Sequence, residues 1–314
     1  MQIPLRCAAH SIALLGFIVS SHAAAPKVGV LLKSRTPFWV AVEKGALRAG
    51  QAAGAEVTVK APMSENDISV QIQLLNGMAA QGVEAIVLAP INKEALAVPI
   101  ASIAVKGVKV IVIDTPPTGK AAPVFIGTDH EAAGKAAGEL LAQVVTDKDD
   151  VSFLKHSRSS GATAARETCA LAAFRAAHPN NVVFGDVYAS IEVGKEASQV
   201  ELLLQLHPST KAVLASGTPG TLAMLKMLQE KKLAGSVKLV GFGFNLTPEV
   251  AAAIENGALT GWIAQLPHEI GAKGVSAALA VLKGETLPAV VHTDFVVVTK
   301  SNLKDPKVQA LLAL

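Results

Sequence analysis

Charged residues are scarce in this chain of 314 residues: Asp, Glu, Lys and Arg make up 17 % of it, below the roughly 25 % that is typical of globular domains. The formal net charge is only +3 and the basic residues do not cluster, so a nucleic-acid footprint is not expected. Apolar residues make up 51 %, which excludes an intrinsically disordered chain. After residue 25 no apolar run approaches the roughly 18 residues of a membrane-spanning helix.

Cysteine is almost absent, and this excludes a disulfide-stapled fold. Cys7 precedes an apolar stretch near the N-terminus, and Cys169 stands alone in a sequence typical of a helix. Because no histidine lies near Cys169 in the sequence, we interpret it as a buried, unreactive thiol. A chain of this length can bury enough apolar surface to fold without disulfides.

The motifs of cofactor and metal chemistry are also missing. The first expected strand is followed by residues 33–36, which contain no glycine, and residues 241–246 lack the third glycine of a dinucleotide-binding turn. There is no P-loop and no nucleophile elbow, and the eight histidines lack the spacing of a metal site. In residues 129–131, Asp-His-Glu, we interpret Asp129 as a helix cap and not as a metal ligand. We therefore expect no cofactor, no metal and no enzymatic activity.

The N-terminal segment has the three parts of a secretory signal peptide. Arg6 is followed by the apolar residues 12–19 and then by small residues up to Ala25. A buried N-terminal helix is the alternative interpretation. We expect residues 1–25 to be a signal peptide, cleaved after Ala23 or after Ala25, and the mature protein to be periplasmic.

The rest of the chain alternates short apolar runs with helical patterns. Glycines at positions 54, 82 and 107 end successive helices, one for each strand–helix unit. Such alternation predicts an α/β protein of two doubly wound, Rossmann-like parallel-sheet lobes, which bind ligands beyond the carboxyl ends of the strands. The expected strands are residues 28–32, 56–59, 85–88, 109–113, 124–127, 151–154, 182–187, 212–215, 237–241, 259–264 and 294–298.

Polar and aromatic residues at the expected strand ends suit a polyhydroxylated ligand. Phe38 and Trp39 follow the first strand, where an aromatic ring can cover the apolar face of a sugar, although either could equally be a core residue. Asp114 ends a strand and can accept two hydroxyl hydrogen bonds, so that its loss would weaken binding and leave the fold intact; a helix cap is the alternative. Arg166 enters a helix behind a glycine loop, and Gln265 ends a further strand.

These residues lie in stretches that resemble a known family. The stretches are residues 37–39 (PFW), 112–114 (VID), 164–166 (AAR), 240–242 (VGF) and 263–275 (IAQLPHEIGAKGV). The layout resembles the periplasmic sugar-binding proteins of ABC transporters, of the ribose-binding type that is related to lactose-repressor effector domains. The resemblance implies the type I fold of that family, with two lobes joined by three crossings near residues 128, 265 and 293.

The resemblance also implies roles for individual residues. Phe38 and Trp39 would form a wall of the site, Asp114, Arg166 and Gln265 would hydrogen-bond the ligand, and Thr128 would lie at a hinge crossing. Thr36 and Asn245 stand at further positions of the ligand site, and Thr36 replaces the usual asparagine.

This sequence departs from the ribose-binding pattern at further positions. Thr115 stands where an arginine is expected, Gly217 and Thr218 replace an Asn-Asp pair, and Gly243 replaces an aspartate, with Phe244 and Asn245 inserted after it. Fewer polar pocket groups predict a ligand with fewer hydroxyls, such as a smaller polyol or a modified sugar, in place of ribose.

We expect the protein to be the monomeric solute-binding component of an ABC import system that delivers a sugar-like ligand to an inner-membrane permease. The alternative is a sensor that presents its ligand to a chemoreceptor or kinase. The expected division is residues 26–128 with 266–292 as the N-terminal lobe, and 129–265 with 293–314 as the C-terminal lobe. Residues 301–314 have helix-like spacing of apolar residues and should pack on the C-terminal lobe.

Overall fold

The computed structural model describes residues 24–118, 122, 124–158, 160–189 and 194–313. The predicted signal peptide, its alternative cleavage sites and Cys7 concern residues 1–25, of which 1–23 lie outside the described residues. Within the described parts of the chain, no helix is both long enough and apolar enough to cross a membrane.

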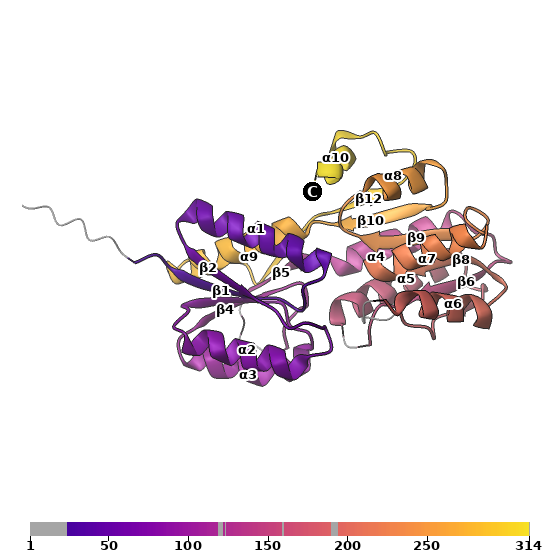
Figure 1. Ribbon diagram of the computed structural model, residues 1–314. Helices are drawn as coiled ribbons and strands as arrows, with labels where there is room; N and C mark the ends of the chain where they lie inside the picture. Colours follow the sequence, from indigo (N-terminus) through magenta and orange to yellow (C-terminus); the bar gives the residue numbers. More distant parts are fainter. Residues whose placement is uncertain (1–23, 119–121, 123, 159, 190–193, 314) are drawn as a thin grey trace, which may run out of the picture.

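Two α/β lobes lie side by side, each built on a six-stranded sheet (Figure 1). The N-terminal lobe contains β1 (Lys27–Leu31), β2 (Glu56–Lys60), β3 (Ala85–Leu88), β4 (Lys109–Ile113), β5 (Val124–Thr128) and β11 (Val290–Thr293). Their order in the sheet is β11-β5-β4-β3-β1-β2. The C-terminal lobe contains β6 (Asp150–Leu154), β7 (Val183–Phe184), β8 (Thr210–Ala215), β9 (Lys238–Gly243), β10 (Gly261–Gln265) and β12 (Phe295–Val298), in the order β12-β10-β9-β8-β6-β7.

Helices cover both faces of each sheet. On the N-terminal lobe, α1 (Pro37–Ala53) and α9 (Pro267–Leu282) share an apolar cluster on one face, and α2 (Ile68–Ala80) and α3 (Lys93–Val105) share another. On the C-terminal lobe, α4 (His130–Ala142) and α5 (Gly161–Ala177) cover one face. The opposite face carries α6 (Glu196–Leu206), α7 (Thr218–Glu230) and α8 (Pro248–Glu255).

Strand β4 shows why the strands appear in the sequence as continuous apolar runs. Ile111 and Ile113 pack toward α1 and α9, while Val110 and Val112 pack toward α2 and α3, because successive side chains of a strand point to opposite faces. Both faces are buried from Val110 to Ile113, so each of these four positions is apolar. The predicted fold class, two doubly wound lobes, is confirmed.

Most helix ends follow the local signals in the sequence. Gly54 ends α1 with φ of 67°, in the left-handed region that glycine adopts without a steric penalty. Asp129 caps α4 by accepting a hydrogen bond of 2.9 Å from the Ala132 N–H. His178 and His207, each followed by proline, form the C-caps of α5 and α6.

The structure corrects four expectations. Strand β11 (Val290–Thr293) was not expected, and β7 is confined to Val183–Phe184 instead of residues 182–187. Cys169 is only partly buried, whereas the sequence predicts a buried thiol. Strand β12 pairs antiparallel with β10, whereas the other strand pairs are parallel. Since only Asp294 separates β11 from β12, the chain passes nearly straight into the second sheet and enters it at its carboxyl edge.

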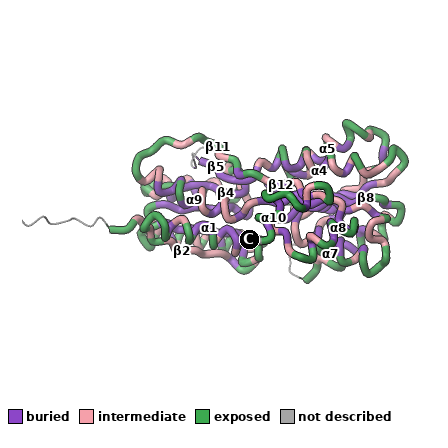
Figure 2. The backbone as a smooth tube through the Cα atoms, turned by 90° about the horizontal axis from the view of Figure 1, so that it is seen from above, coloured by how far each residue is buried: buried purple, intermediate pink, exposed green. Residues whose placement is uncertain are grey.

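The chain passes between the lobes at three places. These are the step from β5 into α4, the step from β10 into α9, and Asp294 between β11 and β12. In the view from above, the two lobes lie side by side and each has a buried interior (Figure 2). At each crossing a strand ends, so the carboxyl ends of the two sheets face each other across the space between the lobes.

Candidate ligand-binding cleft

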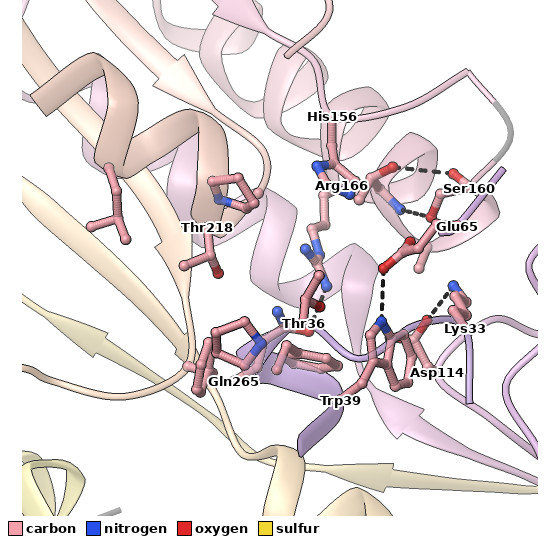
Figure 3. Close-up of a pocket in the computed structure, with 18 of the residues that line it drawn as sticks. Lys33, Thr36, Trp39, Glu65, Asp114, His156, Ser160, Arg166, Thr218 and Gln265 are labelled. Carbon is pink, nitrogen blue, oxygen red and sulfur yellow. Dashed lines mark hydrogen bonds and ion pairs between the residues drawn. The ribbon is translucent and has the colours of Figure 1, made fainter. Parts of the chain in front are cut away.

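A cavity of about 370 Å³ lies between the lobes at the carboxyl ends of both sheets (Figure 3). The segments after β1, β2, β4, β6, β7, β8 and β9 contribute to it, together with the last residue of β10. Its lining residues are Lys33, Thr36, Pro37, Phe38, Trp39, Glu65, Asp114, His156, Ser160, Ala162, Thr163, Arg166, Glu196, Gly217, Thr218, Pro219, Leu222, Phe244, Asn245, Thr247 and Gln265.

A buried ion pair forms the floor of the cavity on the N-terminal lobe. The Nζ of Lys33 lies 2.6 Å from Oδ2 of Asp114 and 2.8 Å from Oγ1 of Thr115, and both charged side chains are less than one-tenth exposed. Burial by itself raises the pKa of Asp114, but Lys33, His130 and Arg166 outweigh it, so that the pKa lies below its usual value and the carboxylate is ionised. Asp114 has φ of 63°, a left-handed conformation that aspartate tolerates better than most residues.

From its position on α5, Arg166 connects α4 with the ends of β8 and β10 within the C-terminal lobe. Its Nε donates to Nδ1 of His130 at 3.1 Å, its Nη1 to the Ser216 carbonyl at 3.1 Å, and its Nη2 to Oε1 of Gln265. Gly134 on α4 allows this position, because a Cβ there would come within 2.4 Å of the Arg166 carbonyl oxygen. Burial lowers the pKa of Arg166 to about 10, so the guanidinium remains charged at neutral pH.

His130 lies behind the cavity as a neutral imidazole. Burial, together with the charge of Arg166, lowers the pKa of His130 to about 3. Because Nδ1 accepts the hydrogen bond from Arg166, the ring proton is on Nε2, which donates to the Asp114 carbonyl oxygen at 3.0 Å. His130 therefore connects Asp114, which follows β4 of the N-terminal lobe, with Arg166 on α5 of the C-terminal lobe.

Gln265 and Thr128 meet where two of the crossings lie together. The Thr128 hydroxyl donates to Oε1 of Gln265 at 3.4 Å, and this oxygen also accepts from Arg166. Gln265 lines the cavity, whereas Thr128 is buried behind it and is not among the lining residues. Of the residues predicted to contact the ligand, Thr128 therefore lies at the crossing from β5 into α4, behind the cavity wall.

Three aromatic rings form one wall. The rings of Phe38 and Trp39 meet edge to face with centroids 5.0 Å apart, and Phe38 meets Phe244 of the other lobe at 5.6 Å. Phe38 and Trp39 pack on the apolar cluster of α1, as the core interpretation expects, and they also line the cavity. Their contact with a ligand stays a prediction. The Asn245 carbonyl accepts a hydrogen bond of 3.1 Å from Nε1 of Trp262, which holds the loop after β9 against the sheet.

Several polar lining residues were missed by the sequence interpretation. Lys33, Glu65, His156 and Thr218 all follow strands, so the rule that found Asp114 could have found them. Nε1 of Trp39 donates to Oε1 of Glu65 at 2.7 Å, which places this carboxylate beside the aromatic wall (Figure 3).

His156 faces Glu65 from the opposite lobe. Its Nδ1 is buried and has no hydrogen-bond partner in the described parts of the chain, where it lies close to Gly217. Burial lowers the pKa of His156, and the nearby carboxylate of Glu65 opposes this shift. His156 is therefore a neutral group with an unused hydrogen-bonding atom at the cleft.

Polar residues that follow other strands compensate for the polar groups that the cavity was expected to lack. Thr115 does replace an arginine, but Lys33 brings a cation to Asp114 from β1. Thr218, Glu65 and His156 add further polar groups to the cavity. Within the residues that the structure describes, no group of three or more His, Cys, Asp or Glu side chains is placed to hold a metal ion.

Two hinged α/β lobes, with a polar and aromatic cavity between their sheet ends, define a solute-binding protein. The family model described as periplasmic binding protein domain matches residues 28–286, and the chain belongs to this family. The predicted resemblance is thereby confirmed.

Individual relatives agree with this assignment. The chain is 29 % identical over 289 residues to the ribose import binding protein of Escherichia coli (strain K12), covering 91 % of this chain and 95 % of that protein. It is 26 % identical to the D-allose-binding periplasmic protein of the same organism, covering 88 % and 91 %. The crystal structure of a carbohydrate transporter solute-binding protein from Agrobacterium radiobacter in complex with D-arabinose superposes with a TM-score of 0.86, at 30 % identity and covering 92 % of this chain and 99 % of that one.

Proposed function

We propose that this protein is the solute-binding component of an ABC import system, which binds a sugar or sugar-like polyol between its lobes and delivers it to a membrane permease. The observation that carries the proposal is the cavity itself, where an aromatic wall stands beside buried, hydrogen-bonding groups from both lobes. A sugar ring has apolar faces and a rim of hydroxyls, and this combination of surfaces complements it.

The proposed contacts use polar atoms that can still form hydrogen bonds with a ligand. Within the described residues, the side chains of Lys33 and Thr115 both donate to Oδ2 of Asp114, which leaves Oδ1 to accept from a ligand hydroxyl. Gln265 uses Oε1 within the protein, which leaves its amide N–H groups for the ligand. The remaining proposed contacts are Thr36, Phe38, Trp39, Arg166 and Asn245 from the sequence interpretation, and Lys33, Glu65 and His156 from the cavity.

Closure would be a hinge motion at the three crossings. We propose residues 26–128 with 266–292 and residues 129–265 with 293–314 as the bodies that move. Apart from Thr293, which belongs to β11, this division agrees with the membership of the two sheets. Thr128, Gln265 and Arg166 would then form a hydrogen-bonded pivot beside the ligand.

Further parts of the proposal rest on the family. The relatives carry sugar-binding names, which supports a carbohydrate as the ligand class and gives no support to the alternative of a sensing role. We propose that the protein is exported to the periplasm by its N-terminal segment, acts as a monomer, needs no cofactor and is not an enzyme; the family is one of binding proteins.

A thermal-shift screen of the mature protein against pentoses, hexoses, deoxy sugars, amino sugars and polyols tests the proposal. A ligand present at about 1,000 times its dissociation constant stabilises the protein by about 4 kcal/mol, which is a readily measured shift. A large shift confined to one class of sugar is the expected result. No shift across the whole panel would overturn carbohydrate binding.

A further inference from the structure

The last residues of the chain form a small packed unit that the proposed binding contacts do not use. After β12 the chain turns and forms α10 (Pro306–Gln309) and the 3₁₀ helix η1 (Ala310–Ala313). We call residues 301–313 the C-terminal extension. In Figure 1 its helix lies beside α8 and β12, and the expected packing on the C-terminal lobe is seen.

One face of the C-terminal extension is buried in the core of that lobe. Leu303, Val308 and Leu311 are 9 %, 2 % and 3 % exposed, and they belong to the apolar cluster that also contains Leu246 and the inner side of α8. Leu312, the next residue after Leu311, is 41 % exposed. The extension is therefore anchored by one defined set of side chains.

The C-terminal extension also holds a loop of the cleft by its backbone. The N–H of Leu246 donates to the Leu311 carbonyl oxygen at 3.1 Å, and Leu246 itself is buried. Leu246 directly follows Phe244 and Asn245, which both line the cavity. The loop of residues 244–247 thus has the ligand cavity on one side and the C-terminal extension on the other.

Two further contacts fix the orientation of this loop. Nε1 of Trp262 donates to the Asn245 carbonyl oxygen at 3.1 Å. Gly243 lies against the same indole ring, where a Cβ would come within 1.6 Å of Cζ2, so the loop leaves β9 in close contact with Trp262. With these anchors in place, Phe244 reaches across to Phe38 of the other lobe, with ring centroids 5.6 Å apart.

We propose that the C-terminal extension positions the loop of residues 244–247, so that Leu311 sets the affinity and selectivity of the cleft without touching the ligand. The inference rests on the proposed function, because a change in the position of the loop is detected through the affinity for the ligand. Loops have few contacts of their own and open more easily than the elements they join. Removing the support behind this loop lets Phe244 and Asn245 move away from the positions that shape the cavity.

The test compares Leu311→Ala with the matched control Leu312→Ala, which removes the same atoms from the exposed neighbour. Affinities for the sugars found in the screen are measured by calorimetry, and amide hydrogen exchange of residues 243–248 is measured without sugar. We expect Leu311→Ala to weaken binding about 2- to 30-fold, to change the ratio of affinities between two sugars, and to speed exchange in the loop. Leu312→Ala should leave all three unchanged.

A double-mutant cycle separates positioning from a general loss of stability. If Leu311 acts through the loop, its substitution should have little further effect on affinity in a Phe244→Ala background. Additive effects, or unchanged affinity and selectivity in a folded Leu311→Ala protein, would overturn the inference. If Leu311→Ala does not fold, the milder Leu311→Val carries the same measurements.

The two proposals fail in different ways. If the intact protein binds no sugar in the panel, the proposed function fails, while hydrogen exchange still reports on the loop. Equal exchange in Leu311→Ala and Leu312→Ala would then overturn the positioning role. If sugars bind and the Leu311 variants bind them unchanged, the function stands and the positioning role is wrong.

Discussion

Lys33 and Asp114 lie 81 residues apart in the chain, yet Nζ of Lys33 is 2.6 Å from Oδ2 of Asp114 at the floor of the cleft. Lys33 follows β1 and Asp114 follows β4, and β3 separates these strands in the sheet. The sequence assigns Asp114 to ligand binding, with a helix cap as the alternative, and predicts that its loss leaves the fold intact. The buried ion pair leads to the different prediction that Asp114 also contributes to stability. Removing one partner leaves the other as a buried, unpaired charge.

We therefore predict that Asp114→Asn lowers the free energy of unfolding by about 3–5 kcal/mol, measured by urea denaturation without ligand. Asparagine suits the left-handed backbone of residue 114, so the loss reports on charge and not on strain. Lys33→Met should cost a similar amount. The double variant should recover much of the loss, because it leaves no unpaired charge; a simple sum of the two single effects would contradict this account.

His130 should make stability depend on pH below neutrality. Its pKa of about 3 in the folded protein lies below the usual 6.5, so only the unfolded chain takes up a proton as the pH falls below 6.5. The stabilisation is complete above pH 6.5 and is lost as the pH falls toward 3, by about 2 kcal/mol at pH 5. Denaturation at a series of pH values from 7 to 4.5 measures the slope.

The matched variant is His130→Gln, which cannot titrate. Its stability at pH 7 is expected to be lower, but its slope between pH 6.5 and 4.5 should be shallower than that of the unmodified protein. The pKa of His156 is also lowered, so this residue should maintain part of the slope. The pKa of His178 is raised, so His178 makes the slope shallower. Equal slopes in the two proteins would show that His130 does not cause the dependence of stability on pH.

Arg166→Lys should weaken sugar binding about 10- to 100-fold, as measured by calorimetry. Lysine cannot reproduce the planar fork that reaches His130, Ser216 and Gln265 together. Arg175→Lys is the control, since this arginine lies on the same helix but is exposed. An affinity that is equal in the two variants would exclude Arg166 from the binding network.

Trp39 should report sugar binding by its fluorescence. Its ring lines the cavity and its Nε1 donates to Glu65, so a ligand at the aromatic wall changes its surroundings. The emission is measured in Trp262→Phe, where Trp39 is the remaining tryptophan of the chain. Glu65→Gln should alter the signal of the free protein, because a weaker acceptor then faces the indole N–H. A spectrum that sugar leaves unchanged, at a concentration where calorimetry detects binding, would place Trp39 away from the ligand.

The local pattern of the sequence determined much of this protein. Apolar runs that alternate with capped helices predict the two parallel sheets, and Gly54 and Asp129 mark helix ends through their own backbone chemistry. Because ligands of such sheets bind beyond the strand ends, the positions of Asp114, Arg166 and Gln265 in the chain were enough to select them as candidates.

Only the tertiary structure decided which of these residues meet. The pairing of Lys33 with Asp114, the approach of His156 to Glu65, and the support of Leu246 by Leu311 depend on strand order and on the placement of one lobe against the other. The antiparallel direction of β12 likewise follows from the crossing at Asp294. Periodicity and capping describe contacts between near neighbours in the chain, whereas these contacts join distant segments and are set by the packing of the whole fold.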